Sequence, residues 1–305
     1  MLPDTTPKLD QDLITFRDWV RWCSSEFRRV SLFYGHGSEN DFDEAIYLVL
    51  WAIAQPWDRL DQLWEVRLTA VEKLSVQTAC RKRIESRCPL AYITGEAWFC
   101  GLRFLVNENV LVPRSPIAEL ILKQFQPWLD RYPERILDLC TGSGCIGIAS
   151  AIEFEDASVD LVDISPEALT LARQNADLYD LGERVLCIES DGLNALGGKR
   201  YDLIVSNPPY VSEAEYESLP QEYKMEPRLG LTSGEDGFDF TRTMLSRVHE
   251  FLNPGGLLVV EVGHDWQHFD TLFNQYPLFW PEFENGGCGI FVLTREQLVA
   301  VIDGN

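Results

Sequence analysis

The residues best suited to chemistry in this sequence are Asn207-Pro208-Pro209-Tyr210, which follow an apolar run that ends at Ser206. Two consecutive prolines fix the backbone, remove two N–H donors and leave carbonyl acceptors projecting. The Asn207 amide can accept through its oxygen and donate through its nitrogen, and the Tyr210 ring offers a flat face. This set suits a planar –NH₂ group, whose hydrogens the acceptors bind while its nitrogen stays free to react.

Such a site has to do most of its work by positioning. An amide nitrogen is a poor nucleophile because its lone pair is delocalised into the carbonyl, and alignment can supply a large part of the missing reactivity. Fixed acceptors also stabilise the positive charge that develops on the nitrogen. If the reaction partner is an electrophile that is already activated, no strong base is needed, so we assign no catalytic histidine.

A glycine-rich loop upstream predicts a cofactor site. The apolar residues 136–139 lead into residues 140–144, which read Cys-Thr-Gly-Ser-Gly, and Gly147 follows. Glycines let a backbone turn sharply and approach a ligand, and the helix expected next has free N–H groups at its start. The three glycines also fit the spacing G-x-G-x-x-G, so this loop alone leaves a nicotinamide dinucleotide open.

Three acids stand where the binding of a nucleoside needs them. Asp163 follows the next apolar run, 21 positions after Gly142, where a carboxylate can accept both ribose hydroxyls. It could instead cap the helix expected at Pro166. Asp191 follows a third run and could reach an adenine amino group or stand in an ordinary turn. Asp138, inside the first run, suits a cofactor with a cationic amino-acid tail better than one with a pyrophosphate.

Strands and helices must alternate to place these loops together. The apolar patterns predict strands at 135–139, 158–162, 185–189, 203–206, 257–262 and 288–293. Helices are expected at about 145–153, 166–180, 237–252 and 265–275. This alternation predicts an α/β domain with a parallel sheet covered by helices on both faces, which binds its ligand beyond the carboxyl ends of the strands.

The N-terminal third has a different pattern. Helical periodicity over 9–34 and 41–86 predicts a small helical bundle, and Ser38, Asn40 and Asp41 can cap the second helical stretch. Alternating residues over 88–113 predict a β-hairpin linker. Val112 and the two prolines at 113 and 116 then stop the strand, and a helix can start at about Ile117. We therefore divide the chain into 1–87, 88–113 and 114–305.

Charge favours a basic protein partner. The net charge is −22, with −2 in residues 1–105 and −20 in residues 106–305. A surface this negative repels phosphate, which disfavours tight binding to DNA, and it attracts polycations. The basic cluster Arg81-Lys82-Arg83 with Arg87 is more simply a solvated helix end than a nucleic-acid site.

The remaining composition excludes several classes of protein. Eight cysteines form no CxxC pair, and we expect reduced thiols in a cytoplasmic protein. Residues 1–7 are polar without an apolar signal core, and no run is long and apolar enough to span a membrane. His264 and His268 have the spacing of two metal ligands but no third ligand, so we predict no metal site.

Together, Asp138, the glycine loop, Asp163 and Asp191 resemble the cofactor frame of an S-adenosylmethionine-dependent methyltransferase, and 252–258 is similar to the turn before a late strand there. With Asn-Pro-Pro-Tyr at 207–210, the chain resembles the HemK-type protein-glutamine methyltransferases over nearly its whole length. This resemblance implies a Rossmann-like class I methyltransferase domain preceded by a helical substrate-recognition domain and the hairpin linker. Residues 226–237 are also similar to that family, in which they wall the active site.

The resemblance implies a role for each site residue. The glutamine amide would be bound by Asn207 and the Pro208 carbonyl, with Pro209 fixing the turn and Tyr210 packing nearby. S-adenosyl-L-methionine would be held by Asp138, Cys140, Thr141, Gly142, Ser143, Gly144, Asp163, Ile164, Asp191, Gly192 and Asn207.

Residues 113–119 read Pro-Arg-Ser-Pro-Ile-Ala-Glu, where release-factor enzymes of the family usually read Pro-Arg-Pro-(Asp/Glu)-Thr-Glu. This variant and the segment 34–44 resemble the branch that acts on large-subunit ribosomal protein uL3, a basic client. Two positions depart from the family pattern. Cys140 stands where many relatives have glycine, and Gly192 stands where release-factor enzymes often carry an aromatic residue.

Three alternatives remain open at this point. A release factor could be the client instead of uL3. An adenine amino group of DNA or RNA is also a planar –NH₂, although such an enzyme needs a basic groove and must flip the base. An interaction protein could keep the fold without activity. Contact with ribosomal RNA has no support in the sequence.

Overall fold

The computed structural model describes residues 12–304, so the polar segment 1–7 lies outside the described residues. The chain folds into two compact units. The first comprises Met1–Glu96 with Pro220–Met225, and the second comprises Ala97–Leu219 with Glu226–Asn305. Within the described part, no helix is both long and apolar enough to cross a membrane.

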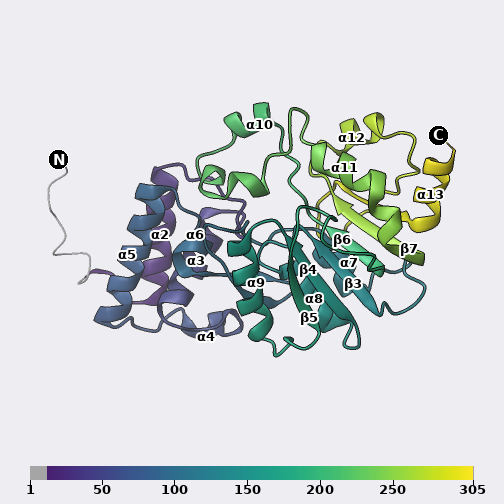
Figure 1. Ribbon diagram of the computed structural model, residues 1–305. Coiled ribbons are helices and arrows are strands. Elements are labelled where there is room, and N and C mark those ends of the chain that lie inside the picture. The colour runs from purple at the N-terminus through teal and green to yellow at the C-terminus, as the bar shows by residue number, and fades with distance from the viewer. Residues whose placement is uncertain (1–11, 305) are drawn as a thin grey trace. The chain divides into compact units, whose positions relative to one another are not determined.

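The first unit is helical (Figure 1). Thr15 and Thr69 form capping boxes at the starts of two of its helices, and Asn40 caps a third as predicted. The helical pattern predicted over 41–86 is interrupted, because Pro56 starts a 3₁₀ turn rather than continuing the helix. Its helical elements are α2 (Phe16–Arg29), α3 (Asp41–Ala52), η1 (Trp57–Arg59), α4 (Leu60–Leu63), α5 (Ala70–Ser86), α6 (Leu90–Thr94) and η2 (Tyr223–Met225).

A buried ion pair lies in this unit. The Arg83 guanidinium is 1% exposed and donates to Glu44 Oε1 at 2.6 Å and to the Phe33 carbonyl at 2.9 Å. The Glu222 carboxylate accepts from the Phe33 N–H at 3.0 Å and from Arg87 at 3.1 Å. These contacts attach the segment Pro220–Met225 to the helices of the unit.

The β-hairpin is shorter than the predicted segment 88–113. Its strands are β1 (Glu96–Phe99) and β2 (Leu102–Leu105), joined by a turn at Cys100 and Gly101. The preceding residues form α6 instead, which ends because Gly95 adopts φ +76° and donates its N–H to the Ala91 carbonyl at 2.8 Å.

The second unit contains a six-stranded sheet with the order β5-β4-β3-β6-β7-β8. Its strands are β3 (Arg135–Leu139), β4 (Ser158–Asp163), β5 (Val185–Glu189), β6 (Tyr201–Ser206), β7 (Leu252–Glu261) and β8 (Ile290–Thr294). Five strands are parallel, but β8 is antiparallel to β7, which corrects the prediction of a wholly parallel sheet. The chain leaves β7 at Glu261 and re-enters the sheet beside it, at Ile290, so β8 must run backwards. β7 starts five residues before its predicted start because Leu252 already pairs with Tyr201.

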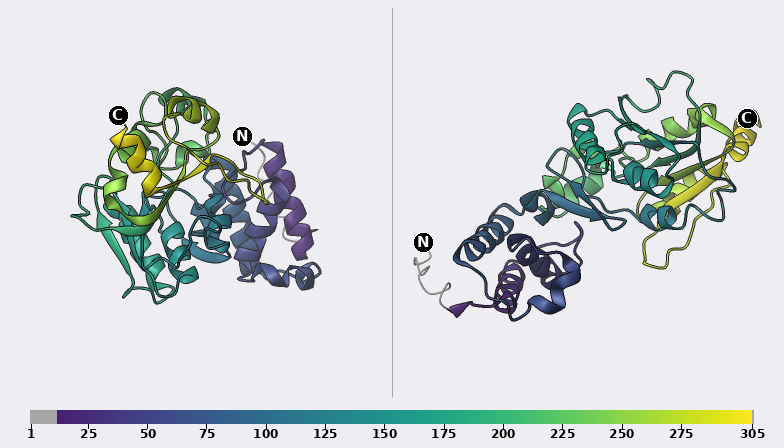
Figure 2. Two further views of the ribbon diagram at one scale, coloured as in Figure 1. Left: turned by 90° about the vertical axis from the view of Figure 1, so that its right-hand side faces the viewer. Right: turned by 90° about the horizontal axis from the view of Figure 1, so that it is seen from below.

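Helices cover both faces of this sheet, as predicted (Figures 1 and 2). One apolar core joins α7, α8 and α9 to one face, and a second joins α11, α12 and α13 to the other. The elements between the strands are α7 (Ile117–Leu122), α8 (Cys145–Glu153), α9 (Pro166–Asp177), α10 (Glu213–Ser218), η3 (Arg228–Gly230), α11 (Asp239–Arg247), η4 (Val248–Phe251) and α12 (Trp266–Leu272), and α13 (Arg295–Asp303) ends the fold.

The buried ion pair generates a prediction about stability. Glu44→Ala leaves the Arg83 guanidinium without its closest carboxylate, so we expect a loss of about 3 kcal/mol in the free energy of unfolding. Urea unfolding measures it. Glu65→Ala is the control, because Glu65 pairs with Arg17 on the surface and should lose less than about 1 kcal/mol. Equal losses in the two variants would contradict the importance of the buried pair.

Candidate active site

The two predicted loops meet because their strands are neighbours. β3 pairs with β6 in parallel, with Leu139 opposite Ser206, so Cys140 and Asn207 each begin the loop that leaves the same edge of the sheet. The Ser206 hydroxyl donates to the Leu139 carbonyl at 2.7 Å and ties the two strand ends together. The strand order changes direction between β3 and β6, which is the place where open α/β sheets bind their ligands.

A cavity of about 410 Å³ opens at this edge. Its size is in the range usual for small-molecule sites. Three of the predicted site residues, Asp138, Gly144 and Pro208, are buried and do not line it. The predicted residues that line it are Cys140, Thr141, Gly142, Ser143, Asp163, Ile164, Asp191, Gly192, Asn207, Pro209 and Tyr210.

Asp138 is fully buried beneath the loop. Its Oδ2 accepts from the Thr141 hydroxyl at 2.5 Å and from the Gly147 N–H at 2.8 Å. Among the described residues, none donates a hydrogen bond to its Oδ1. Burial raises the pKa of this carboxyl to about 6, while its two donors work in the opposite direction. A carboxylate with an open acceptor under a cofactor loop is suited to a cationic amino group, reached directly or through water.

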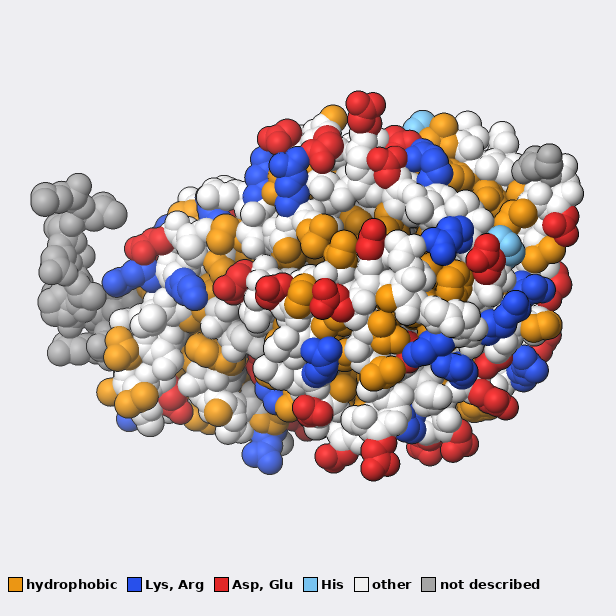
Figure 3. Space-filling model, viewed as in Figure 1, with side chains coloured by type: hydrophobic (Ala, Val, Ile, Leu, Met, Phe, Trp, Pro, Cys, Tyr) orange, Lys and Arg blue, Asp and Glu red, His pale blue; other side chains and the backbone are white. Residues whose placement is uncertain are grey.

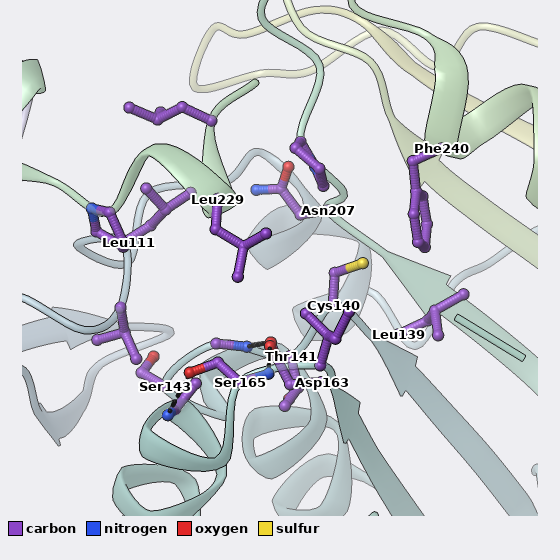
Figure 4. A pocket seen from close by; sticks show the side chains of 18 of the residues that line it. Leu111, Leu139, Cys140, Thr141, Ser143, Asp163, Ser165, Asn207, Leu229 and Phe240 are labelled. Atoms are coloured by element: carbon purple, nitrogen blue, oxygen red, sulfur yellow. Dashed lines mark hydrogen bonds between the residues drawn. The ribbon is translucent and has the colours of Figure 1, made fainter. Parts of the chain in front are cut away.

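Asp163 lies at the end of β4 and faces the same loop. Its Oδ2 accepts from the Gly142 N–H at 2.9 Å and its Oδ1 accepts from the Ser165 N–H at 2.9 Å (Figure 4). Burial raises its pKa, and these backbone donors limit the rise. Ser165, and not Asp163, caps α9 through the Ala168 N–H. Each carboxylate oxygen keeps lone-pair capacity that can accept a ribose hydroxyl.

The backbone of the loop requires its glycines. Gly142 has φ +55°, and a Cβ built on Gly147 would lie 2.2 Å from Leu161 Cδ2 and 2.9 Å from Asp138 Cβ. Glycine is the only residue that meets both demands without strain. Cys140 has φ +62°. This backbone conformation costs a residue with a side chain about 1 kcal/mol or more. A glycine at this position would adopt it without that strain.

The Asn207 amide projects into the cavity on the side of β6 (Figure 4). Its Oδ1 is buried and accepts no hydrogen bond from any residue within 12–304. A buried acceptor without a partner is costly unless a ligand satisfies it. Tyr210 lies at the same edge and donates its hydroxyl to Glu261 Oε1 at 3.0 Å.

Sequence reasoning missed Phe240 and Glu261. Phe240 lines the cavity from α11, and its ring lies within 4 Å of the Cβ position of Gly192. Phe240, 48 residues later in the chain, thus supplies the aromatic ring that Gly192 lacks. A motif search at position 192 cannot find it, because only the tertiary fold brings α11 to the loop after β5.

The cavity has apolar walls and shows no sign of a metal. Leu111, Leu229 and Leu231 are among the residues that line it. Across the part of the chain that the structure describes, no group of three or more His, Cys, Asp or Glu side chains could hold a metal ion.

Known proteins place this chain in a family. A ribosomal protein uL3 glutamine methyltransferase from Francisella tularensis subsp. tularensis (strain SCHU S4 / Schu 4) is 42% identical over 299 residues, which cover 96% of this chain and 95% of the relative. A protein of the same name from Bordetella pertussis is 43% identical over 291 residues, covering 94% and 97%. This chain belongs to the uL3 glutamine methyltransferase family. The methyltransferase small domain family also matches residues 117–222.

Its cofactor is S-adenosylmethionine, the methyl donor of this methyltransferase family. The donor set described above fits that molecule. The open Oδ1 of Asp138 suits the ammonium group, the Asp163 carboxylate suits two ribose hydroxyls, and Phe240 offers an aromatic face beside Asp191. Among solved structures, a methyltransferase from Pyrococcus furiosus has a TM-score of 0.45 and 21% identity, covering 64% of this chain and 89% of that one, which is too distant to bear on function.

The buried Asp138 generates a prediction about pH. Its pKa is raised on folding, so its contribution to stability is complete below pH 3.8 and is lost as the pH rises through about 6. Asp138→Asn removes this loss. Between pH 5 and pH 8, urea unfolding of the cofactor-free protein should show a fall in stability that is smaller by about 1 to 2 kcal/mol than in the unmodified protein. Parallel curves for the two proteins would contradict the raised pKa.

Phe240 generates a prediction about cofactor affinity. Phe240→Ala removes the aromatic face beside Gly192, so the dissociation constant for S-adenosylmethionine should rise about tenfold in titration calorimetry. Phe240→Tyr keeps the ring and should stay within about threefold of the unmodified protein. An unchanged dissociation constant for Phe240→Ala would exclude this contact.

Proposed function

We propose that this protein methylates the side-chain amide nitrogen of a glutamine in ribosomal protein uL3. The observation that carries the proposal is the buried Asn207 Oδ1, which lacks a partner within the described residues and stands beside the cofactor loop. The relatives that are 42% and 43% identical over almost the whole chain bear this activity in their names. Each relative matches along 95% or more of its own length.

Asn207 selects the acceptor. Its Oδ1 accepts one N–H of the glutamine amide, and we assign a second acceptor to the Pro208 carbonyl on the strength of the motif alone. When bound, S-adenosylmethionine supplies a methyl group on a positively charged sulfur, and the amide nitrogen takes that methyl while the sulfur keeps the electrons of the broken bond. Asn207 holds the nitrogen in line and stabilises its developing charge. One amide proton then leaves for solvent.

The walls of the cavity assist by limiting water. Leu111 and Leu231 are among the apolar lining residues, and Tyr210 supplies a flat surface on which a planar amide can pack. No histidine is among the lining residues. This arrangement suits a reaction that needs alignment more than it needs a base.

Charge assists the encounter with a basic client. The second unit carries most of the −22 net charge. Acidic side chains are spread over the face shown in Figure 3, with Lys and Arg between them, rather than gathered in one patch. We therefore assign the negative charge to the attraction of a polycation and to the rate of association, and not to one docking patch.

All described residues that line the cavity belong to the second unit. We propose that residues 1–87 recognise the client, that the hairpin region links them to the catalytic residues, and that the protein acts in the cytoplasm. All eight cysteines are free thiols, as a reducing compartment requires.

The test supplies purified protein and tritiated S-adenosylmethionine with three separate acceptors: uL3, a release factor and DNA. We expect label in uL3, located by mass spectrometry on one glutamine. Label only in the release factor would keep the chemistry and change the client. Label only in DNA would overturn the proposal.

The same assay tests the role of Asn207 by comparing two asparagine variants. Asn207→Ala should lower the rate of label transfer to uL3 about 100-fold or more, because it removes an acceptor used in the transition state. Asn285→Ala changes an exposed asparagine that donates to Glu119, and it should keep the normal rate. A near-normal rate for Asn207→Ala would refute the amide clamp.

A further inference from the structure

Glu261 connects the two loops that flank the acceptor side of the cavity. It is the last residue of β7 and is only 4% exposed. Its Oε1 accepts from the Tyr210 hydroxyl at 3.0 Å, and its Oε2 accepts from the Ser115 hydroxyl at 2.5 Å. Both donors line the cavity, whereas Glu261 stands behind them. One carboxylate therefore holds the loop that contains Ser115 and the loop that contains Asn207.

Tyr210 is held from its other sides as well. A Cβ on Gly263 would lie 2.5 Å from Tyr210 Cε2, so the ring packs directly on that backbone. A Cβ on Gly237 would lie 2.4 Å from the Tyr210 carbonyl oxygen. Protonation of Glu261 can therefore alter the hydrogen bond of the Tyr210 hydroxyl while the ring stays packed on Gly263.

The groups that face Glu261 are the Ser115 hydroxyl and the Arg114 guanidinium, both from the segment 112–116, and the Tyr210 hydroxyl. The positive charge of Arg114 lowers the pKa of Glu261, as do the hydrogen bonds from Ser115 and Tyr210. Arg114 is in turn bound by both oxygens of Glu226, at 2.7 and 2.5 Å. Burial outweighs these effects and raises the pKa of Glu261 to about 7.

The two protonation states of Glu261 cannot make the same contacts. The ionised carboxylate accepts from both hydroxyls, at 3.0 and 2.5 Å. A protonated carboxyl carries a donor on one oxygen, so the hydroxyl that faces this oxygen must accept instead of donate, or give up the contact. The pH at which this occurs lies within the range in which an intracellular enzyme works.

We propose that Glu261 is a positioning residue whose ionised carboxylate fixes Tyr210 beside Asn207 and whose protonation alters the hydrogen bond of the Tyr210 hydroxyl. Its use in catalysis rests on the proposed function. The change in the Tyr210 contact does not, because it occurs in the protein alone. The two claims are therefore tested separately.

The first experiment needs no client. Carbon-13-labelled tyrosine is incorporated, and the ring resonances of Tyr210 are assigned by their loss in Tyr210→Phe. Between pH 5.5 and pH 8.5 we expect the Tyr210 signal to shift with an apparent pKa near 7, and we expect no such shift in Glu261→Gln. A Tyr210 signal that does not titrate in the unmodified protein overturns the proposal. If Glu261→Gln fails to fold, this result still decides the question.

The second experiment measures label transfer to uL3 as a function of pH. In the unmodified protein kcat should fall on the acid side with an apparent pKa near 7, and in Glu261→Gln this limb should be absent. We expect Glu261→Gln to lower kcat about tenfold at pH 8, because a small misplacement of a positioning group is costly, while KM for uL3 changes less than threefold. Glu282→Gln on the surface is the matched control and should behave normally.

A double-mutant cycle separates positioning from a general loss of structure. If Glu261 acts through Tyr210, Glu261→Gln with Tyr210→Phe should be no slower than the slower single variant, because both remove one contact. Additive losses, or an acid limb that persists in Glu261→Gln, would overturn the catalytic part of the proposal. Absence of any label in uL3 with the unmodified protein would instead refute the proposed function and leave the resonance experiment to judge Glu261.

Discussion

The parallel pairing of β3 with β6 determines whether this molecule has a site at all. Leu139 lies opposite Ser206, and the Ser206 hydroxyl binds the Leu139 carbonyl at 2.7 Å. The loop predicted to bind the cofactor and the loop predicted to bind the amide therefore start side by side, at Cys140 and Asn207. A slip of this pairing would separate the two loops and turn alternate side chains to the wrong face. Both layers of helices stabilise this pairing, because each buries one face of the two central strands.

The buried carboxylates of the site lower the stability of the fold near neutral pH. Asp138, Asp163 and Glu261 all have a pKa that burial raises. Each of them contributes stability below its ordinary pKa and loses it as the pH rises through the raised value. Near neutral pH the cofactor-free protein therefore carries buried carboxylates that it holds only with a few hydrogen bonds. We expect the binding of a cationic cofactor near Asp138 to offset part of that cost, which would couple ligand binding to stability.

Local sequence patterns predicted most of the elements that carry the site. Periodicity and glycine placement predicted α8 at its observed bounds, and the apolar runs predicted β3 and β5 at theirs. The direction of β8 could not be predicted in this way, because an apolar run has the same pattern whichever way the strand runs. The helix α6 was missed because its five residues are too few to show a period, and its end depends on the backbone of Gly95.

The site residues also divide into those that a local pattern predicts and those that it does not. The structure brings the motif residues of four strand ends to one cavity, because each motif lies at or just after the end of a strand. Phe240 and Glu261 carry no motif, and their partners Gly192 and Tyr210 are 48 and 51 residues away in the chain. Their place is fixed by packing across the sheet and not by local pattern. The roles of the individual residues follow from chemistry and geometry, and they stay predictions until a bound complex is seen.

The most direct measurement is a crystal structure of the protein with S-adenosylhomocysteine and a glutamine-containing peptide of uL3. We predict that the glutamine amide nitrogen lies about 3 Å from Asn207 Oδ1, with the ribose hydroxyls on Asp163. This prediction would be contradicted if the peptide and the nucleoside both bind in the cavity while the glutamine amide makes no contact with Asn207.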